Sequence, residues 1–138
     1  MQVEHVEGGA PRPALDVFNL HLGLSARERE LQLGLLLCSR EFSELPHDAP
    51  TIVAGDFNDW RSLLQPLLIA QLAFRCATGP HALQEQPSRT YPSFFPRGPL
   101  DRIYYRGAIR LLWARRCRLK TSRVASDHLP IVAEFVVR

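Results

Sequence analysis

One short segment constrains the fold of this chain more than any other. Residues 51–54 form an uncharged run, Thr-Ile-Val-Ala, that follows Pro50 directly. β-branched side chains favour extended backbone, and a strand without a polar face has to be covered on both sides. The run therefore predicts a buried strand inside a layered fold. It leads into a polar sequence, Gly-Asp-Phe-Asn-Asp-Trp, at residues 55–60.

The segments before this strand predict a strand and a helix. Residues 14–20 mix apolar and polar positions in a β-prone run that ends near Asn19 and His21. Ser25 and Glu28 have the spacing of a capping box, so we expect a helix over residues 26–44. Its apolar stripe is predicted at helical spacing, formed by Leu31, Leu35, Cys38 and Phe42.

The segments after the buried strand alternate in type. We expect a second helix over residues 61–73, with Pro66 in its first turn, and a long loop over residues 76–99, which is rich in Pro, Gly, Ser and Gln. Three β-prone runs follow, at residues 100–105, 108–118 and 131–137. Helices between strands, followed by several strands, indicate a layered α/β fold. Residues 1–13 are expected to be a loose N-terminal segment before one domain over residues 14–138.

Composition supports a folded chain. Of its 138 residues, 46% are hydrophobic and 22% are charged, which suits one ordinary domain and argues against disorder. No apolar run is long enough for a transmembrane helix, and the first twenty residues lack the pattern of a signal peptide. The three cysteines form neither a disulfide framework nor a CxxC zinc motif, so we expect a reducing, cytoplasmic setting.

The charges are unevenly distributed. The net charge is +3, but residues 102–126 hold eight basic residues and no acidic one. Sixteen of the seventeen basic residues are arginines, which bind phosphate in a bidentate manner. The second half could therefore face a polyanion, and a basic nucleic-acid-binding module is one reading of the chain. Charge alone favours the simpler reading, an ordinary solvated surface.

Two pairs of polar residues are candidates for chemistry. Asp56 and Asn58 stand two positions apart where the buried strand ends, so their side chains are expected on one face, where they could orient a water and bind an anionic oxygen. Asp127 and His128 combine a ligand for a hard cation with a proton acceptor, and Asp101 is the candidate carboxylate partner of the imidazole. For each pair considered alone, a residue pair that only shapes a turn is the better interpretation, narrowly so for Asp56 and Asn58.

Four short motifs in a fixed order strengthen these candidates. They are N-x-H-L at residues 19–22, G-D-F-N at 55–58, L-D-R-I at 100–103 and S-D-H-L-P at 126–130. Together they resemble the endonuclease/exonuclease/phosphatase superfamily, which includes DNase I-like nucleases, abasic-site endonucleases, sphingomyelinases and inositol polyphosphate 5-phosphatases. The resemblance extends from Ala14 to Val137. It implies a layered α/β sandwich of the DNase I-like type and metal-dependent cleavage of phosphate esters.

The resemblance also implies roles for individual residues. Asp56 would orient or deprotonate the attacking water, and Asn58 would bind the phosphate. His128, paired with Asp101, would contact the scissile phosphate, and His21 would be a phosphate-side donor or general acid. Asp127 would bind the metal, Mg²⁺ or alternatively Mn²⁺. The loop before the L-D-R-I strand is often substrate-facing in relatives, which makes three of its side chains candidate substrate-binding residues: Arg89, Tyr91 and Phe94.

The sequence departs from the family in one respect. Members carry a metal-binding Glu on a helix in an N-terminal half, and neither Glu4 nor Glu7 stands in such a context. The chain therefore looks like the C-terminal half of a domain. One hypothesis is the catalytic half of a phosphoesterase acting on nucleic acid, phospholipid head groups or inositol phosphates. The alternative is a non-catalytic, truncated domain. In either case an exposed sheet face would favour self-association.

Overall fold

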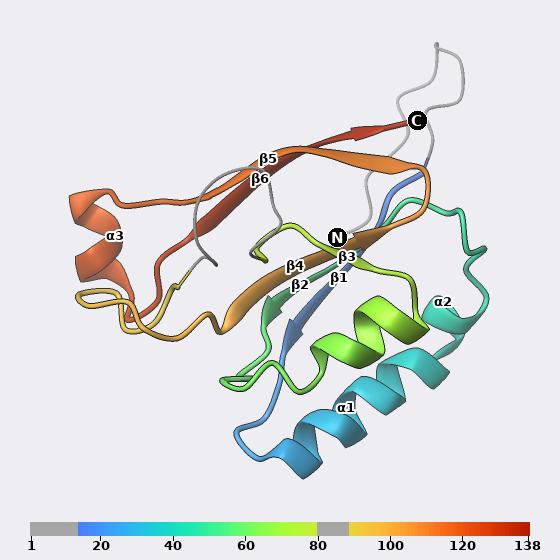
Figure 1. Cartoon of the computed structure of the whole chain (residues 1–138), viewed down its shortest axis with the longest axis horizontal. Coiled ribbons are helices and arrows are strands. Elements are labelled where there is room, and N and C mark those ends of the chain that lie inside the picture. Colours follow the sequence, from blue (N-terminus) through green and yellow to red (C-terminus); the bar gives the residue numbers. More distant parts are fainter. Residues whose placement is uncertain (1–13, 80–88) are drawn as a thin grey trace.

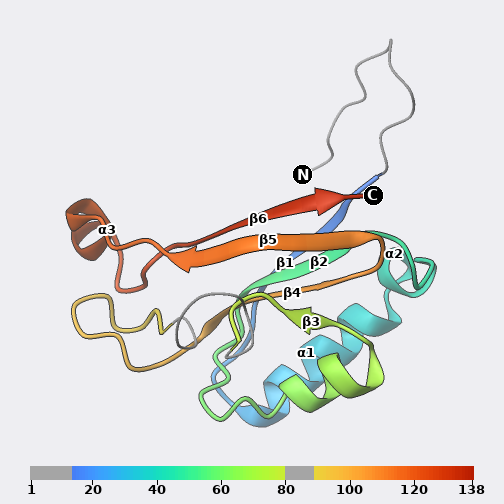
Figure 2. The same ribbon diagram turned by 45° about the horizontal axis from the view of Figure 1, so that its top comes forward.

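The structure, a computed structural model, describes residues 14–79 and 89–138. In chain order its elements are β1 (Asp16–His21), α1 (Ala26–Cys38), α2 (Arg40–Ser43), β2 (Thr51–Asp56), the π-helical turn η1 (Leu67–Gln71), β3 (Arg75–Cys76), β4 (Asp101–Arg106), β5 (Ile109–Arg116), α3 (Lys120–Ala125) and β6 (Ile131–Val137). The elements lie in three layers, with α1, α2 and η1 below a four-stranded sheet and a two-stranded sheet above it, while α3 lies at one end of the molecule (Figures 1 and 2). The predicted loose segment, with Glu4 and Glu7, lies outside the described residues.

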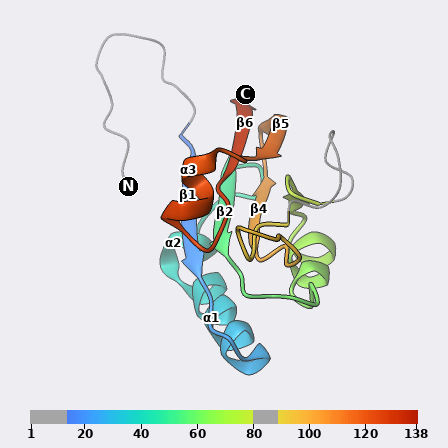
Figure 3. The same ribbon diagram turned by 90° about the vertical axis from the view of Figure 1, so that its left-hand side faces the viewer.

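The larger sheet has the strand order β1-β2-β4-β3, and β5 pairs with β6 in the smaller one. β1 runs parallel to β2, whereas β4 is antiparallel to both β2 and β3. Figure 3, viewed from the end that carries α3, shows β1, β2 and β4 side by side with α1 below them. The layered α/β class predicted from the sequence is confirmed.

β2 is the covered strand that its sequence predicts. Val53 packs into the core cluster under the sheet, together with residues of α1, α2 and η1. Ile52 belongs to a second cluster between the two sheets, which includes Tyr105 of β4 and Ile109 of β5. Since successive side chains of a strand point to opposite faces, one strand contributes to both cores. The uncharged sequence of β2 follows from this double burial.

The predicted helix over residues 26–44 is confirmed in place, but its buried face is different. Ser25 and Glu28 form the capping box, and the helix breaks at Ser39 into α1 and α2. Leu31 and Leu35 of the predicted stripe are each 64% exposed. Cys38 is exposed too, whereas Phe42 of the predicted stripe is buried in the core as expected. The other core-facing side chains are Leu33, Leu36 and Leu37. Leucines at so many successive positions give the helix no single apolar stripe, so spacing alone does not identify the buried face.

The other predicted helix is wrong in detail, and one short helix was not predicted. The predicted helix over residues 61–73 is reduced to η1, which begins after Pro66 and ends at Gln71, where Leu72 donates its N–H to the Leu67 carbonyl. α3 lies between the β-prone runs predicted at residues 108–118 and 131–137, where no element was predicted. It is a one-and-a-half-turn helix without a side-chain cap, which leaves little periodic signal in the sequence. No helix in the described part of the chain is both long and apolar enough to span a bilayer.

We predict opposite effects for alanine at two glycines. Gly55 has φ +136°, and a Cβ built there would lie 1.9 Å from the Leu20 carbonyl oxygen of β1. Gly55→Ala is therefore expected to lower the free energy of unfolding by at least about 2 kcal/mol. Gly34 lies inside α1 and a Cβ there meets nothing within 4 Å, so Gly34→Ala should raise stability by about 0.5–1 kcal/mol. Urea unfolding followed by circular dichroism measures both, and a neutral Gly55→Ala would contradict the close packing of β1 against β2.

Candidate functional site

Three candidate side chains stand in one row across the larger sheet. Asp56 is the last residue of β2, and it lies opposite His21 of β1 and Asp101 of β4 in the strand register. Residues directly opposite one another in a sheet point to the same face. This face is the one toward β5 and β6. Ile52 precedes Asp56 by four residues on β2, so it lies on the same face, and it packs between the two sheets. The strand ends therefore place an imidazole and two carboxylates side by side.

Asp56 and Asn58 are held together by a turn and not by strand periodicity. β2 ends at Asp56, and Asn58 has a left-handed backbone with φ 49°. The Asn58 backbone N–H donates to Asp56 Oδ1 at 2.8 Å, and Asn58 Nδ2 donates to the Leu22 carbonyl at 2.7 Å. The two residues are close to each other, as the sequence predicts. The cause is an Asx turn, in which the Asp56 carboxylate accepts from the backbone two residues on, and Asn58 is a residue type that tolerates the left-handed backbone conformation. The buried Asn58 side chain also ties this turn to the end of β1.

His128 reaches the row from the loop between α3 and β6. Its backbone N–H donates to Ser126 Oγ at 3.1 Å. Two bonds join this loop to the segment before β4, from Leu129 N to the Thr90 carbonyl at 3.0 Å and from Ser93 N to the Asp127 carbonyl at 2.7 Å. Thr90 is fully buried, and its hydroxyl lies 3.4 Å from the Asp101 backbone N–H. Thr90 therefore connects the strand that carries Asp101 with the loop that carries His128.

His128 pairs with one carboxylate and faces another. Nδ1 of the imidazole lies 2.7 Å from Asp101 Oδ2, and Nε2 lies 3.8 Å from Asp56 Oδ2. Because an ionised carboxylate only accepts, Nδ1 carries the proton and Nε2 points toward Asp56 and the solvent. Burial by itself lowers the pKa of His128, but the hydrogen bond and charge of Asp101, with the charges of Asp56 and Asp127, outweigh it and raise the pKa above 6.5.

On the other side of Asp56 lies His21, whose Nε2 is 3.9 Å from Asp56 Oδ2. The His21 side chain is largely exposed to solvent, in contrast to that of His128. Asp56 thus has an imidazole on each side at a separation that a shared water or phosphate oxygen can bridge. A carboxylate between two imidazoles can accept, hold and pass on a proton.

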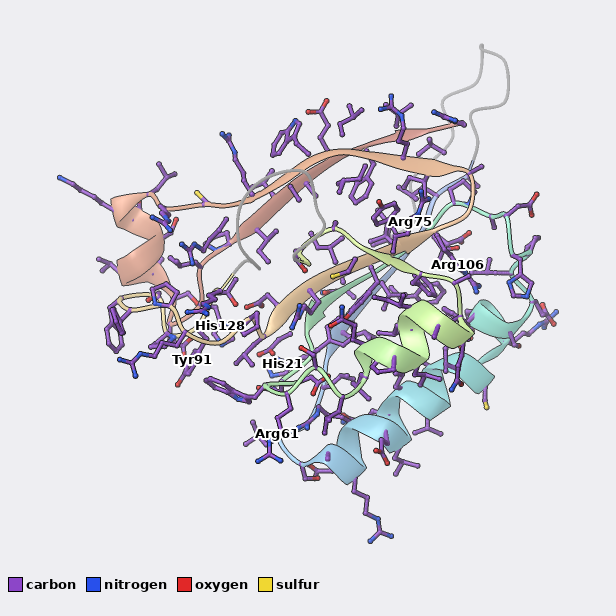
Figure 4. All side chains as sticks on the ribbon, in the orientation of Figure 1. His21, Arg61, Arg75, Tyr91, Arg106 and His128 are labelled. Carbon is purple, nitrogen blue, oxygen red and sulfur yellow. The ribbon has the colours of Figure 1, made fainter. Side chains whose placement is uncertain are left out.

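These residues line one cleft of about 560 Å³, within the usual size of a ligand site. Its lining residues are His21, Leu24, Asp56, Asn58, Trp60, Tyr91, Leu100, Asp101, Ser126, Asp127 and His128. Figure 4 shows His21, Tyr91 and His128 at the same end of the molecule. The structure therefore brings together all the candidates except Arg89 and Phe94. Phe94 is 77% exposed, and Arg89 accepts a hydrogen bond from the Arg116 side chain through its backbone carbonyl.

Several lining residues were not expected from the sequence. Leu100 and Ser126 are the first residues of the L-D-R-I and S-D-H-L-P motifs, and Leu24 and Trp60 follow the N-x-H-L and G-D-F-N motifs by two residues. Their place in or next to a motif is the one signal that could have identified them. Thr90 lies in the loop predicted over residues 76–99 and was not a candidate residue. Its role depends on contacts with Asp101 and Leu129, which are distant in the chain.

The arginines of the basic segment are partly structural. Arg102 is buried and donates to Ser62 Oγ, and Arg106 is buried with its guanidinium 4.9 Å from the rings of both Phe42 and Phe74. Figure 4 shows Arg75 and Arg106 far from the end that holds His128. These arginines stabilise the sheet and its helices through aromatic and polar contacts, so they are not available to a polyanion at the cleft.

The described residues do not fit a complete metal site. In residues 14–79 and 89–138, no group of three or more His, Cys, Asp or Glu is arranged to hold a metal ion. Asp56 and Asp101 are engaged by the Asn58 backbone and by His128. The Asp127 residue is exposed, and it is one ligand where a hard cation needs six or more.

The sequence comparisons agree with these motifs. The sequence profile of the Endonuclease/Exonuclease/phosphatase family matches residues 5–128. The uncharacterized protein YbhP of Escherichia coli K12 is 39% identical over 123 residues, which are 88% of this chain and 46% of that protein. The chain thus spans about half the length of the curated relatives it matches.

Solved structures share the fold. A functionally unknown conserved protein from Enterococcus faecalis aligns with a TM-score of 0.66 at 23% identity, over 88% of this chain and 50% of its own. D. rerio TDP2, solved with a single-strand DNA product, aligns with a TM-score of 0.60 at 23% identity, over 88% of this chain and 56% of its own. The described residues therefore form a partial α/β domain of a known type.

The raised pKa of His128 predicts a pH-dependent stability. A pKa raised on folding means that protonated His128 contributes stability that is fully present below about pH 6.5 and is lost as the pH rises through the folded-state pKa. Asp101→Asn removes the main stabilising charge, so the His128 pKa should fall and this pH dependence should weaken. NMR titration of the His128 ring, with urea unfolding between about pH 5 and 8, measures both effects. Asp48→Asn, an exposed carboxylate outside the cleft, is the control, and an unchanged titration in Asp101→Asn would contradict the pairing.

Proposed function

Because the chain belongs to the endonuclease/exonuclease/phosphatase family, we propose that it carries the catalytic residues of a phosphoesterase that cleaves a phosphate ester with an activated water. The observation that supports this most directly is the row of His21, Asp56 and Asp101, completed by His128 from a distant loop. A carboxylate next to an oriented imidazole is an arrangement that can move a proton to or from water.

In this proposal Asp56 positions and deprotonates the water. Its Oδ1 is held by the Asn58 N–H, which leaves Oδ2 toward the cleft and the two imidazoles. His128, oriented by Asp101 through Nδ1, presents Nε2 to the phosphate and, when protonated, stabilises its developing negative charge. The raised His128 pKa increases the protonated fraction near neutral pH.

Three residues complete the assignment. His21, the most exposed imidazole of the row, is proposed to donate to the phosphate side or protonate the leaving group. One side-chain N–H of Asn58 donates to the Leu22 carbonyl, so the second is proposed to donate to a phosphate oxygen. Asp127 is proposed as a metal ligand. Since the described residues do not form a full metal site, none of these steps passes through an ion.

The proposal includes a requirement for Mg²⁺, with Mn²⁺ as the alternative. Members of the family generally use divalent metals. Asp127 would supply one ligand, and the remaining ligands would come from outside the described residues. The ion, when bound, supplies positive charge for the phosphate. All three cysteines are free thiols, which supports a reducing, cytoplasmic setting for this reaction.

Nucleic acid, phospholipid head groups and inositol phosphates are all candidate substrates because they share the same ester chemistry. Tyr91 lines the cleft with its ring centroid 5.0 Å from that of His128, which supports a substrate contact for this residue. Arg89 and Phe94 lie outside the lining, so we propose for them only contacts with parts of a substrate that extend beyond the cleft.

The proposal predicts metal-dependent phosphate-ester hydrolysis by the 138-residue chain. Release of product from DNA, phospholipid and inositol phosphate substrates is measured with Mg²⁺ and with EDTA. Asp56→Ala and His128→Ala should each lower the rate by about 10²- to 10⁴-fold, because each removes a group that moves a proton. His47→Ala, an exposed histidine at the opposite end of β2, is the control and should leave the rate unchanged.

Three outcomes of this assay would refute the proposal. Absence of metal-dependent release would favour the alternative of a non-catalytic, truncated domain. The motivation for that alternative is that neither Glu4 nor Glu7 stands in the context of the family's metal-binding Glu. Salt-sensitive nucleic-acid binding without cleavage would favour a basic binding module. Release that persists unchanged in both variants would show that other residues carry the chemistry.

We also propose that two copies associate through β6. One edge of β6 pairs with β5, and no strand of the described residues pairs with its other edge. Val132 and Val136 of β6 and Val17 of β1 are exposed. An open edge with apolar side chains is a template for pairing with another chain.

This association predicts a dimer in light scattering coupled to size exclusion. Val132→Lys places a charge on the open strand and should shift the chain toward monomer. Val124→Lys, on the exposed side of α3, is the matched control and should leave the dimer intact. A wild-type chain that stays monomeric at high concentration would contradict the proposal.

A further inference from the structure

Trp60 is an exposed aromatic residue at the mouth of the cleft. It follows the turn of Asn58 and Asp59, lines the cleft and is 54% exposed. Tryptophan is highly buried on average, so a half-exposed indole beside candidate catalytic groups needs an explanation. The reaction proposed for Asp56 and His128 does not use it.

The position of the indole is fixed from two sides. The Trp60 and Tyr91 rings lie 5.8 Å apart at 88°, an edge-to-face arrangement. On the other side, a Cβ on Gly98 would come within 2.7 Å of Trp60 Cζ3, so the indole rests against a backbone position that only glycine leaves open. Gly98 and Tyr91 are joined in turn by backbone hydrogen bonds of 2.8 and 3.1 Å.

The loop that carries Trp60 is also held in place. Asp59 is buried, and its Oδ2 accepts a hydrogen bond from the Leu64 N–H at 2.8 Å. A ring fixed in this way loses little conformational entropy when a ligand binds to it. Trp60 therefore offers a preorganised apolar surface in the same cleft as the row of His21, Asp56 and Asp101.

The cleft lining combines two kinds of side chain. Asp56, Asp101, His128 and His21 contribute carboxylates and imidazoles, and Trp60 and Leu24 contribute apolar surface. Resting on the phosphoesterase function proposed above, we propose that Trp60 is a specificity-determining residue that stacks on a nucleobase of the substrate while the ester lies at Asp56 and His128. Planar bases stack on aromatic side chains with about 1–3 kcal/mol per base.

The chain allows a direct test because Trp60 and Trp113 are its two tryptophans. In a Trp113→Phe variant the fluorescence comes from Trp60. The variant is titrated with AMP and with ribose 5-phosphate, which share the sugar phosphate and differ in the base. AMP should quench the fluorescence and bind about 5- to 100-fold more tightly than ribose 5-phosphate.

Variants in the otherwise wild-type chain, measured by calorimetry, separate stacking from general stability. Trp60→Phe keeps a planar ring and should retain a reduced preference for AMP, whereas Trp60→Ala should bind both ligands alike. Gly98→Ala leaves the indole in the sequence but displaces it, and should weaken the preference. Phe95→Ala, an exposed ring of the same loop outside the cleft lining, is the control and should change nothing.

The outcomes distinguish this inference from the proposed function. Equal affinity for AMP and ribose 5-phosphate, or no binding of either, overturns the role of Trp60 even if the chain hydrolyses phosphate esters. A preference for AMP that Trp60→Ala abolishes supports the role of Trp60 even if no hydrolysis is found, in which case only the proposed function fails.

Discussion

The pairing of β2 between β1 and β4 is the interaction on which the rest of the structure depends. It places Asp56 opposite both His21 and Asp101, at the point where the parallel strands end and the antiparallel one begins. A slip of one residue in either pair would turn a member of the row toward the helices, because strand side chains alternate between faces. The close approach of Gly55 to Leu20 fixes this register where it matters most. The apolar core and the polar site are therefore determined by the same hydrogen-bond ladder.

A second set of contacts completes the row from outside the sheet. His128 lies after α3, and it reaches Asp101 because Thr90, Ser93 and Leu129 join their two loops by hydrogen bonds. The carboxylate then selects the tautomer and raises the pKa of the imidazole. The sheet alone would present two acids and an exposed imidazole, so the chemistry depends on a loop whose position the sheet does not determine.

The sequence predicts features that rest on local chemistry. The β-branched run of β2, the capping box of Ser25 and Glu28 and the four motifs could all be read from neighbouring residues. Features set by tertiary packing were missed or wrong. The leucine-rich α1 could bury any of several faces, and burial of Leu33 with exposure of Leu31 follows from where the sheet lies. The Trp60 indole packs against Gly98, which is far from it in the sequence, so no local sequence pattern predicts this contact.

The charge of the cleft limits what can bind there. Three carboxylates and two imidazoles line it, and in the described part of the chain its lining includes no arginine or lysine. A phosphate ester entering this site gains positive charge only from protonated His128 and His21 or from a cation, so its charge contributes little net affinity by itself. Binding then has to draw on the uncharged part of the substrate. Trp60 and Leu24, the apolar side chains named above in the lining, can recognise that part, which makes affinity and specificity depend on the same side chains.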